Sequence, residues 1–140
     1  VSGETVKRTL FGQYKAGQLL NLEKALLATG RLGGHLVSGH VDGVGVVSRF
    51  ARIGESHELV IVAPRPLARY IARKGSITVQ GVSLTVNRVA DVEDGCEFSI
   101  NLIPHTVQVT TLGSLKAGSR VNLEIDLIAR YAERMMAAED

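Results

Sequence analysis

The sequence predicts an all-β domain, a small six-stranded barrel with short helices and a C-terminal α-helix. Fifteen glycines separate segments rich in Val, Thr and Ile, a composition typical of short strands joined by tight turns. About six such segments lie between residues 33 and 126. Closing so few strands into a barrel pairs those that would otherwise be exposed sheet edges.

A near-repeat at the two ends of the chain indicates its domain organisation. "FGQYKAGQLLNLEKAL" begins at residue 11 and "LGSLKAGSRVNLEIDL" begins at residue 112. At an offset of 101, residues 1–26 and 102–127 share eleven identities without a gap. An offset of this length has the size of a domain rather than of a solenoid repeat. We therefore expect a duplicated domain, with a nearly whole second copy and only the tail of the first.

The first half of the chain is expected to contain a tail, a linker and two strands. Residues 1–26 should hold a Thr-capped turn, a Gly turn at Gly17 and a strand that ends near Glu23, and residues 27–32 should be a linker. "HLVSGHVDGVGVVSRF" alternates as a strand, with glycines that allow it to bend. "HELVIVAP" is a second strand, stopped by its proline.

The second half should contain one helix, four strands and a terminal helix. "PLARYIARKG" has helical spacing, with Gly75 after the helix end. "SITVQGVSLTVNRVA" reads as two strands that meet near Gly81, and "CEFSINLI" as a strand ended by the following proline. Thr106 is expected to cap a short helical turn. "SRVNLEID" is the last strand, and "LIARYAERMMA" is an amphipathic helix.

Composition argues against several classes of partner. The net charge is +2, the basic residues are scattered and aromatic residues make up 4%, so a nucleic-acid surface has little support. The sequence shows neither an apolar run of membrane-spanning length nor a secretory leader. The single Cys96 excludes an internal disulfide and fits a reducing compartment. We expect a cytoplasmic protein that binds neither nucleic acid nor a membrane.

The polar residues that could carry chemistry have alternative readings. His35 and His40 are five apart, on opposite faces of a strand, which is unsuitable for one metal ion. His40 is either a hydrogen-bonded barrel residue or a proton carrier. Ser83 and Thr85 face the same side of a strand, where they could hold a polar ligand or form a solvated surface.

Further candidates lie near the ends of expected elements. Ile103 could offer an apolar wall, and Thr106 a hydroxyl as well as a cap. Asp126 is expected to cap the terminal helix, and Lys74 to lie at a helix C-terminus, where a cation is favoured. Cys96 has no adjacent base in the sequence and is interpreted as structural. These residues alone predict a duplicated barrel that binds something small and polar.

Four phrases in one order resemble a known family. "GGHLVSGHVDG", "KGSITVQGVSLTVN", "LIPHTVQVTTLG" and "GSRVNLEIDLIARYAER" together resemble riboflavin synthase of the alpha-chain type, from residue 1 to about residue 137. The resemblance implies two homologous six-stranded Greek-key barrels and a homotrimer. Residues 1–26 would then be the tail of the N-terminal lumazine-binding barrel, residues 33–126 the C-terminal lumazine-binding barrel, and residues 127–140 a trimerisation helix.

The resemblance also implies a reaction. Two molecules of 6,7-dimethyl-8-ribityllumazine undergo dismutation by four-carbon transfer to riboflavin and 5-amino-6-(ribitylamino)pyrimidinedione, a transferase reaction without metal or cofactor. The site lies between unlike barrels of neighbouring subunits, and lumazine synthase is a further implied partner. One alternative is a non-catalytic lumazine- or flavin-binding antenna protein of the same fold. Another is a duplicate barrel that serves only oligomerisation. The complete C-terminal contact set favours the enzyme over both.

Residue by residue, the resemblance implies a site. His40, Ser83, Thr85 and Asp126 match catalytic positions, with general acid–base work for His40. Matching substrate-binding positions are Gly39, His40, Val41, Lys74, Ser83, Leu84, Thr85, Ile103, Pro104, His105, Thr106, Val107 and Gln108, with Val1, Ser2, Gly3, Glu4 and Thr5 as the equivalent segment of the other barrel. The family's opening Phe-Thr-Gly and its Gly-x-Cys-Leu-Thr strand are not in this sequence, and Cys96 does not replace that cysteine. We therefore expect the 140-residue chain by itself not to make riboflavin.

Overall fold

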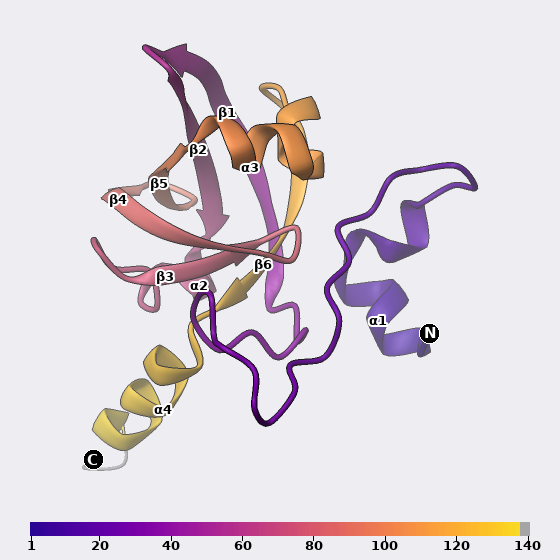
Figure 1. Cartoon of the computed structure of the whole chain (residues 1–140). Helices are drawn as coiled ribbons and strands as arrows, with labels where there is room; N and C mark the ends of the chain where they lie inside the picture. The colour runs from indigo at the N-terminus through magenta and orange to yellow at the C-terminus, as the bar shows by residue number, and fades with distance from the viewer. Residues whose placement is uncertain (138–140) are drawn as a thin grey trace.

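The computed structural model describes residues 1–137, and its centre is a closed barrel of six antiparallel strands. The strands are β1 (Gly43–Ile53), β2 (Ser56–Pro64), β3 (Ser76–Val79), β4 (Val82–Val92), β5 (Gly95–Leu102) and β6 (Arg120–Ile125). Their order around the barrel is β1-β2-β5-β4-β3-β6, and β6 pairs with β1 to close it (Figure 1). Because β2 lies beside β5 while β3, β4 and β5 are consecutive neighbours, the topology is a Greek key. The predicted fold class is confirmed.

Short helices lie around the barrel. They are α1 (Gly3–Arg8), the 3₁₀ helix η1 (Leu10–Gln13), α2 (Arg65–Ala68), α3 (Pro104–Val109), the 3₁₀ helix η2 (Thr111–Ser114) and α4 (Leu127–Met136). Residues 14–42 contain neither helix nor strand and run outside the barrel from η1 to β1 (Figure 1). In the part of the chain that the structure describes, no helix is long and apolar enough to cross a membrane.

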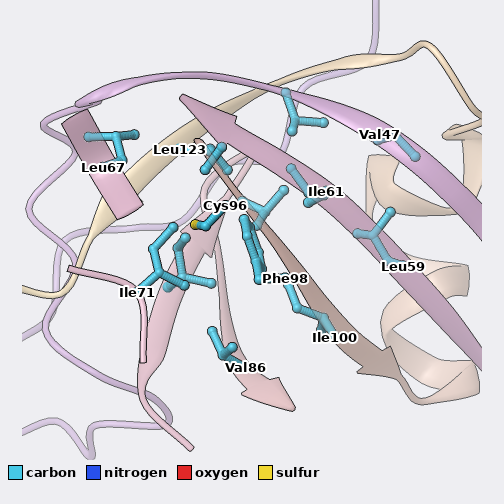
Figure 2. Packing of buried hydrophobic residues seen from close by; sticks show 14 of the residues in the cluster. Val47, Leu59, Ile61, Leu67, Ile71, Val86, Cys96, Phe98, Ile100 and Leu123 are labelled. Carbon is cyan, nitrogen blue, oxygen red and sulfur yellow. The ribbon is translucent and has the colours of Figure 1, made fainter. Parts of the chain in front are cut away.

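The interior of the barrel is filled by the inward residues of all six strands. Figure 2 shows Val47, Ile61, Phe98 and Leu123 among the side chains that gather there from β1, β2, β5 and β6. Each of these four is at most 1% exposed. Fully burying a large apolar side chain contributes about 1.5–3 kcal/mol, so this cluster stabilises the barrel.

The β3–β4 hairpin matches the expectation from the sequence. Its two strands are joined by Gln80 and Gly81, whose φ angles are +51° and +80°. Two consecutive positive φ angles are the signature of a type I′ turn, whose twist matches that of the flanking strands. Ser83 pairs with Thr78, and Thr85 with Ser76. The hairpin therefore fixes both hydroxyl residues of β4 opposite polar residues of β3.

One expected strand begins later than predicted, and another does not form. The first barrel strand begins at Gly43, and residues 35–42 form a loop because their polar groups bond to the outside of the sheet rather than to a neighbouring strand. The strand expected to end near Glu23 is also wrong for this structure. Its counterpart β6 lies between β1 and β3, whereas no strand of the described chain lies beside residues 18–23. A lone strand has no source of ladder hydrogen bonds.

The helix expected over residues 66–75 is shorter than predicted. It is α2, which ends at Ala68, so neither Lys74 nor Gly75 lies at a helix end. The N–H of Lys74 donates to the carbonyl of Val86 (2.8 Å), and the N–H of Val86 donates to the carbonyl of Gly75 (2.9 Å). These bonds extend the pairing of β3 with β4. They also occupy the backbone N–H of Lys74 and the carbonyl of Gly75, which are therefore not available to a longer helix.

The expected capping role of Thr106 is also wrong. Thr106 lies inside α3, whose N-cap is Ile103 and has no side-chain cap. Its carbonyl accepts a hydrogen bond from the hydroxyl of Thr110 (2.7 Å), and Thr110 caps η2. The preceding proline accounts for this shift, because proline favours the first turn of a helix.

The two similar segments have the same local structure. The bounds of α1 and α3 are 101 residues apart, as are those of η1 and η2. Thr9 and Thr110 cap the 3₁₀ helices with φ angles of −124° and −125°. Gly17 and Gly118 have φ angles of +85° and +84°. Similar sequence has therefore produced similar helices, caps and turns in two surroundings.

The two segments also bond to each other reciprocally. Asn21 Oδ1 accepts the N–H of Thr111 (2.8 Å), and Asn122 Oδ1 accepts the N–H of Leu10 (2.9 Å). Asn21 and Asn122 are 101 residues apart, and so are Leu10 and Thr111. A contact in which each side makes the same bond to the other is the pattern of a local twofold axis. Asn21 Nδ2 also donates to the carbonyl of Gln80 (2.8 Å), which fastens the N-terminal segment to the β3–β4 turn.

Candidate functional site

Two polar rows cross the outer face of β6, β3 and β4. In the first row, Thr78 pairs with Glu124 on one side and with Ser83 on the other. Strand alternation turns these side chains outward, because the intervening residues of β3 and β6 fill the interior. Thr78 and Glu124 are nevertheless only 2% and 6% exposed. Something outside the sheet therefore covers this row.

The second row lies one step along the same face. Ser76 pairs with Thr85, and Ile77 pairs with Ile125. Asp126 follows Ile125 directly, so it lies on the side of Ser76 opposite Thr85. Asp126 Oδ1 accepts the N–H of Ile128 (2.9 Å), which confirms the expected cap of α4.

Residues 34–42, here called the strap, cover the first row. His35 lies between Ser83 and Thr78: its Nδ1 is 2.7 Å from Ser83 Oγ, and its Nε2 is 3.2 Å from Thr78 Oγ1. Its backbone N–H also donates to Ser83 Oγ (3.3 Å). Farther along, the N–H and the hydroxyl of Ser38 both donate to one oxygen of Glu124, at 2.8 Å. The buried carboxylate is thereby paired with donors from the strap.

Both ends of the strap are fixed to the barrel. A Cβ atom on Gly34 would lie 2.5 Å from Ser83 Oγ, so only glycine allows this approach. At the other end, Asp42 Oδ2 accepts the N–H of Ile125 (2.9 Å), and Asp42 Oδ1 accepts from Arg130 of α4 (2.6 Å). This hydrogen bond to Asp42 raises the pKa of the Arg130 guanidinium above its ordinary value. The strap therefore connects the polar rows to the terminal helix.

The strap places its two histidines differently from the strand that the sequence suggested. His35 is half-buried and bonded on both ring nitrogens. His40 is exposed, and no hydrogen bond to its ring is found within residues 1–137. Gly39, with φ of +76°, makes the turn that precedes it, and Val41 follows. The prediction that Ser83 and Thr85 share one face is confirmed, with Ser83 under the strap and Thr85 exposed beside it.

The remaining candidates border these rows to different degrees. Lys74 has a left-handed φ of +68°, uncommon for a residue other than glycine, and its bond to Val86 holds it beside β4. Val86 pairs with Ile100 of β5, and Ile103 lies three residues after Ile100. Lys74 and Ile103 are thus connected through neighbouring positions of β4 and β5. Residues 103–108 then form the start of α3. Leu84 turns toward the core, against which it packs.

Residues 1–5 are not brought to the strap. They form the N-cap and first turns of α1, where Ser2 accepts the N–H of Thr5 (3.1 Å). Figure 1 shows α1 apart from the lower end of the barrel, where the strap and α4 lie. No hydrogen bond within the described residues joins residues 1–5 to the strap or to either polar row.

Sequence reasoning missed Thr78 and Glu124 of the covered row and Ser38 of the strap, which bonds to Glu124. A signal was available, because Thr78 and Glu124 stand between strand residues that face the interior. A polar side chain at such a position faces outward, and burial there requires a partner. His35 was considered only as a possible metal ligand or a structural residue.

Two hollows of about 230 and 210 Å³ lie elsewhere, between residues 10–22 and the barrel. Tyr14 and Gln80 line both of them, and none of the candidate site residues lines either. Both hollows lie beside the reciprocal contact of the two similar segments. We therefore assign the candidate site to the polar rows, where the chemically useful side chains gather, and not to these hollows.

Comparison with known proteins identifies the family. The model of the lumazine binding domain matches residues 38–126. The chain is 48% identical over 139 residues to riboflavin synthase of Photobacterium phosphoreum, covering 99% of this chain and 62% of that protein. It is 47% identical over 138 residues to riboflavin synthase of Mycobacterium tuberculosis, covering 97% of this chain and 67% of that protein.

Solved structures give the same result for the fold. LumP complexed with 6,7-dimethyl-8-(1'-D-ribityl) lumazine superposes with a TM-score of 0.73 at 25% identity, over 89% of this chain and 69% of that one. LumP complexed with riboflavin gives a TM-score of 0.75 at 27% identity, over 87% and 64%. The chain spans less than two thirds of the length of its Photobacterium relatives. The fold, the matched domain and these identities together show that the chain belongs to the riboflavin synthase family and carries its lumazine-binding domain.

Proposed function

We propose that residues 33–126 are the C-terminal lumazine-binding barrel of a riboflavin synthase. The reaction is the dismutation of two molecules of 6,7-dimethyl-8-ribityllumazine by four-carbon transfer, which gives riboflavin and 5-amino-6-(ribitylamino)pyrimidinedione. The observation that carries the proposal is the gathering of Ser83, Thr85 and Asp126 on adjacent rows of one face. The identities of 40–48% to riboflavin synthases support it.

The chemistry proposed for the site divides between binding and proton transfer. Ser83 and Thr85 present hydroxyls to polar atoms of the ligand, and the segment that starts at Ile103 forms a wall of the site. Holding two ring systems face to face supplies much of the rate, because it converts a bimolecular step into an oriented one. The C7 methyl of one lumazine must lose a proton, and we assign this general acid–base work to His40. Asp126 supplies a carboxylate near the reacting groups.

The composite site requires a second barrel, of which residues 1–26 would be the tail. The matched helices of residues 1–26 and 102–127 support this interpretation. So do Leu20 and Leu22, which are exposed although their counterparts Val121 and Leu123 are buried in β6. Without the other strands of the first barrel, the chain by itself should not form riboflavin.

The terminal helix is proposed to hold a homotrimer. Two of its polar residues face their own barrel, since Arg130 pairs with Asp42 and Glu133 pairs with Arg69 (2.8 Å). Its apolar residues Tyr131 and Met135 are exposed. This orientation is the reverse of that of an ordinary surface helix. A cytoplasmic location and a contact with lumazine synthase stay predictions.

A second candidate function is binding without catalysis. The superposition with LumP favours it, because crystal structures of that protein hold a lumazine, riboflavin or flavin mononucleotide. The two candidates differ in product formation and not in ligand binding. Both predict that riboflavin fluorescence changes when the chain is added.

The decisive experiment pairs the chain with a second barrel. The chain is joined behind the N-terminal portion of the Photobacterium phosphoreum enzyme, and lumazine-dependent riboflavin formation is followed by absorbance. We expect the fusion to be active and the 140-residue chain to be inactive. An inactive, folded fusion that still binds riboflavin would favour the non-catalytic candidate. In an active fusion, His40→Ala should lower turnover about 10²–10⁴-fold, and equal turnover would remove His40 from the mechanism.

A further inference from the structure

We propose that His35 is a positioning residue that fixes the hydroxyl of Ser83 as a hydrogen-bond donor toward the ligand. The inference rests on the proposed function of the same site. It concerns a residue to which neither the family resemblance nor the sequence pattern gave a role. His35, on the strap, forms hydrogen bonds with both Ser83 and Thr78.

The direction of the hydrogen bonds follows from counting donors and acceptors. Ser83 Oγ already accepts the backbone N–H of His35 (3.3 Å). A neutral imidazole has one donor nitrogen and one acceptor nitrogen. If Nδ1–H donates to Ser83 Oγ (2.7 Å), then the hydroxyl of Thr78 donates to Nε2 (3.2 Å), and every group is matched. The opposite tautomer would leave the hydroxyl hydrogen of Thr78, which is 2% exposed, without an acceptor among the described residues. Ser83 Oγ then accepts two N–H groups, and its own hydroxyl hydrogen is free to point away from the imidazole.

The surroundings hold this arrangement in place. Thr78 is 2% exposed, and Gly34 passes so close to Ser83 that any side chain on it would collide with Oγ. Hydrogen bonds excluded from water are stronger and more directional than exposed ones. Ser83 is therefore presented as a donor, and it selects a ligand group or a water molecule that accepts. A free serine would rotate its hydroxyl and accept or donate equally.

Substitutions at His35 separate positioning from folding. In His35→Asn the amide nitrogen can stand where Nδ1 stands and donate to Ser83, whereas His35→Leu has no donor. We expect His35→Leu to weaken riboflavin binding tenfold or more, and His35→Asn to bind within about threefold of the parent. The difference in affinity between the two variants corresponds to the loss of about one hydrogen bond. Ser38→Ala is the matched control, because it loosens the same strap at Glu124 without touching Ser83. Riboflavin fluorescence gives the affinity, and circular dichroism checks the fold.

A second measurement does not depend on ligand binding. Nitrogen-15 NMR of the His35 imidazole in the ligand-free chain should show the tautomer protonated at Nδ1. Thr78→Val, which removes the hydroxyl that donates to Nε2 at nearly constant shape, should shift the tautomer population, and Thr78→Ser should restore it. A parent chain that binds no riboflavin but shows the expected tautomer would contradict the proposed function and not the hydrogen-bond direction. A proton on Nε2, or equal losses of affinity in His35→Leu, His35→Asn and Ser38→Ala, would overturn the positioning role.

Discussion

Residues 1–26 and 102–127 share one sequence pattern but differ in their neighbours. Both segments form a helix, a Thr-capped 3₁₀ helix and a Gly turn at matching positions. After the turn they diverge. Leu123 is 0% exposed in β6, whereas its counterpart Leu22 is 90% exposed in a segment without a strand. The difference teaches that local sequence is sufficient for these helices and turns, while the strand exists only where neighbouring strands supply its hydrogen bonds.

The reciprocal asparagines show how the two segments remain coupled. Each contributes an amide oxygen that accepts a backbone N–H of the other. The N-terminal segment is therefore docked on the barrel although it adds no strand to it. Comparing matched substitutions in the two segments isolates the effect of surroundings, because the residue types and the local backbone are nearly the same.

The largest difference is expected for the paired leucines. Leu123→Ala removes a fully buried side chain and should lower the free energy of unfolding by about 2–5 kcal/mol. Leu22→Ala removes an exposed side chain and should change it by about 0.5 kcal/mol or less. Urea unfolding followed by circular dichroism measures both. Similar losses for the two variants would mean that Leu22 is buried in solution, by another copy or by residues outside this chain.

The paired glycines should differ less. A Cβ atom on Gly113 would lie 2.4 Å from the carbonyl oxygen of Val107, which is backbone and cannot move aside. On Gly12 the nearest atom would be a methyl of Val6 at 2.8 Å, which can rotate. Gly113→Ala should therefore lower the free energy of unfolding by about 1–3 kcal/mol, and Gly12→Ala should lower it by clearly less. Thermal unfolding that ranks Gly12→Ala as the more damaging change would show that the two helical turns are packed differently from this description.

The asparagines should give a smaller and more symmetrical effect. Asn21→Ala and Asn122→Ala each leave one part-buried N–H without its acceptor, and each should cost about 1 kcal/mol. Because both bonds hold the N-terminal segment, either substitution should speed proteolysis within residues 14–33. Gln18→Ala, on the same segment, is the control. Faster cleavage in only one of the two variants would argue against a reciprocal contact.

The smallest effect concerns the thiol, which only the barrel contains. Burial, with a lesser contribution from Asp91, raises the pKa of Cys96 above its ordinary value of 9.0. The stability linked to the protonated thiol is complete below pH 9.0 and decreases as the pH rises toward the raised pKa of the folded state. The decrease is at most about 1.4 kcal/mol per pH unit. It should be absent from Cys96→Ala, and parallel pH profiles for parent and variant would contradict the prediction.

Local pattern was sufficient to predict much of the fold. The turn at Gly81, the proline after β5, the N-cap Asp126 and the amphipathic α4 each depend on neighbouring residues, and each is found in the structure. The errors have one common cause. Residues 35–42 alternate like a strand, and residues 69–75 continue the helical spacing of α2. Both adopt other structures because their polar groups bond to distant strands. Such long-range competition does not appear in a local pattern.

The candidate site was predictable only in its parts. The shared face of Ser83 and Thr85 follows from strand geometry. The position of Asp126 across Ser76 from Thr85 requires the register of three strands, of which two are far apart in the sequence. The contact of His35 with Ser83 requires the path of the strap. The sequence pattern therefore identified hydroxyl residues without showing which imidazole holds one of them.

One measurement tests the central claim most directly: backbone NMR of the chain during titration with 6,7-dimethyl-8-ribityllumazine or riboflavin. If the outer face of β6, β3 and β4 is the binding site, the largest shift changes will fall on Ser83, Thr85 and the strap, with smaller changes around Ile103. The residues that line the hollows beside the N-terminal segment, such as Tyr14 and Gln80, will change little. Saturable binding with its largest shifts at Tyr14 and Gln80, and none at Ser83 or Thr85, would contradict the assignment of the site.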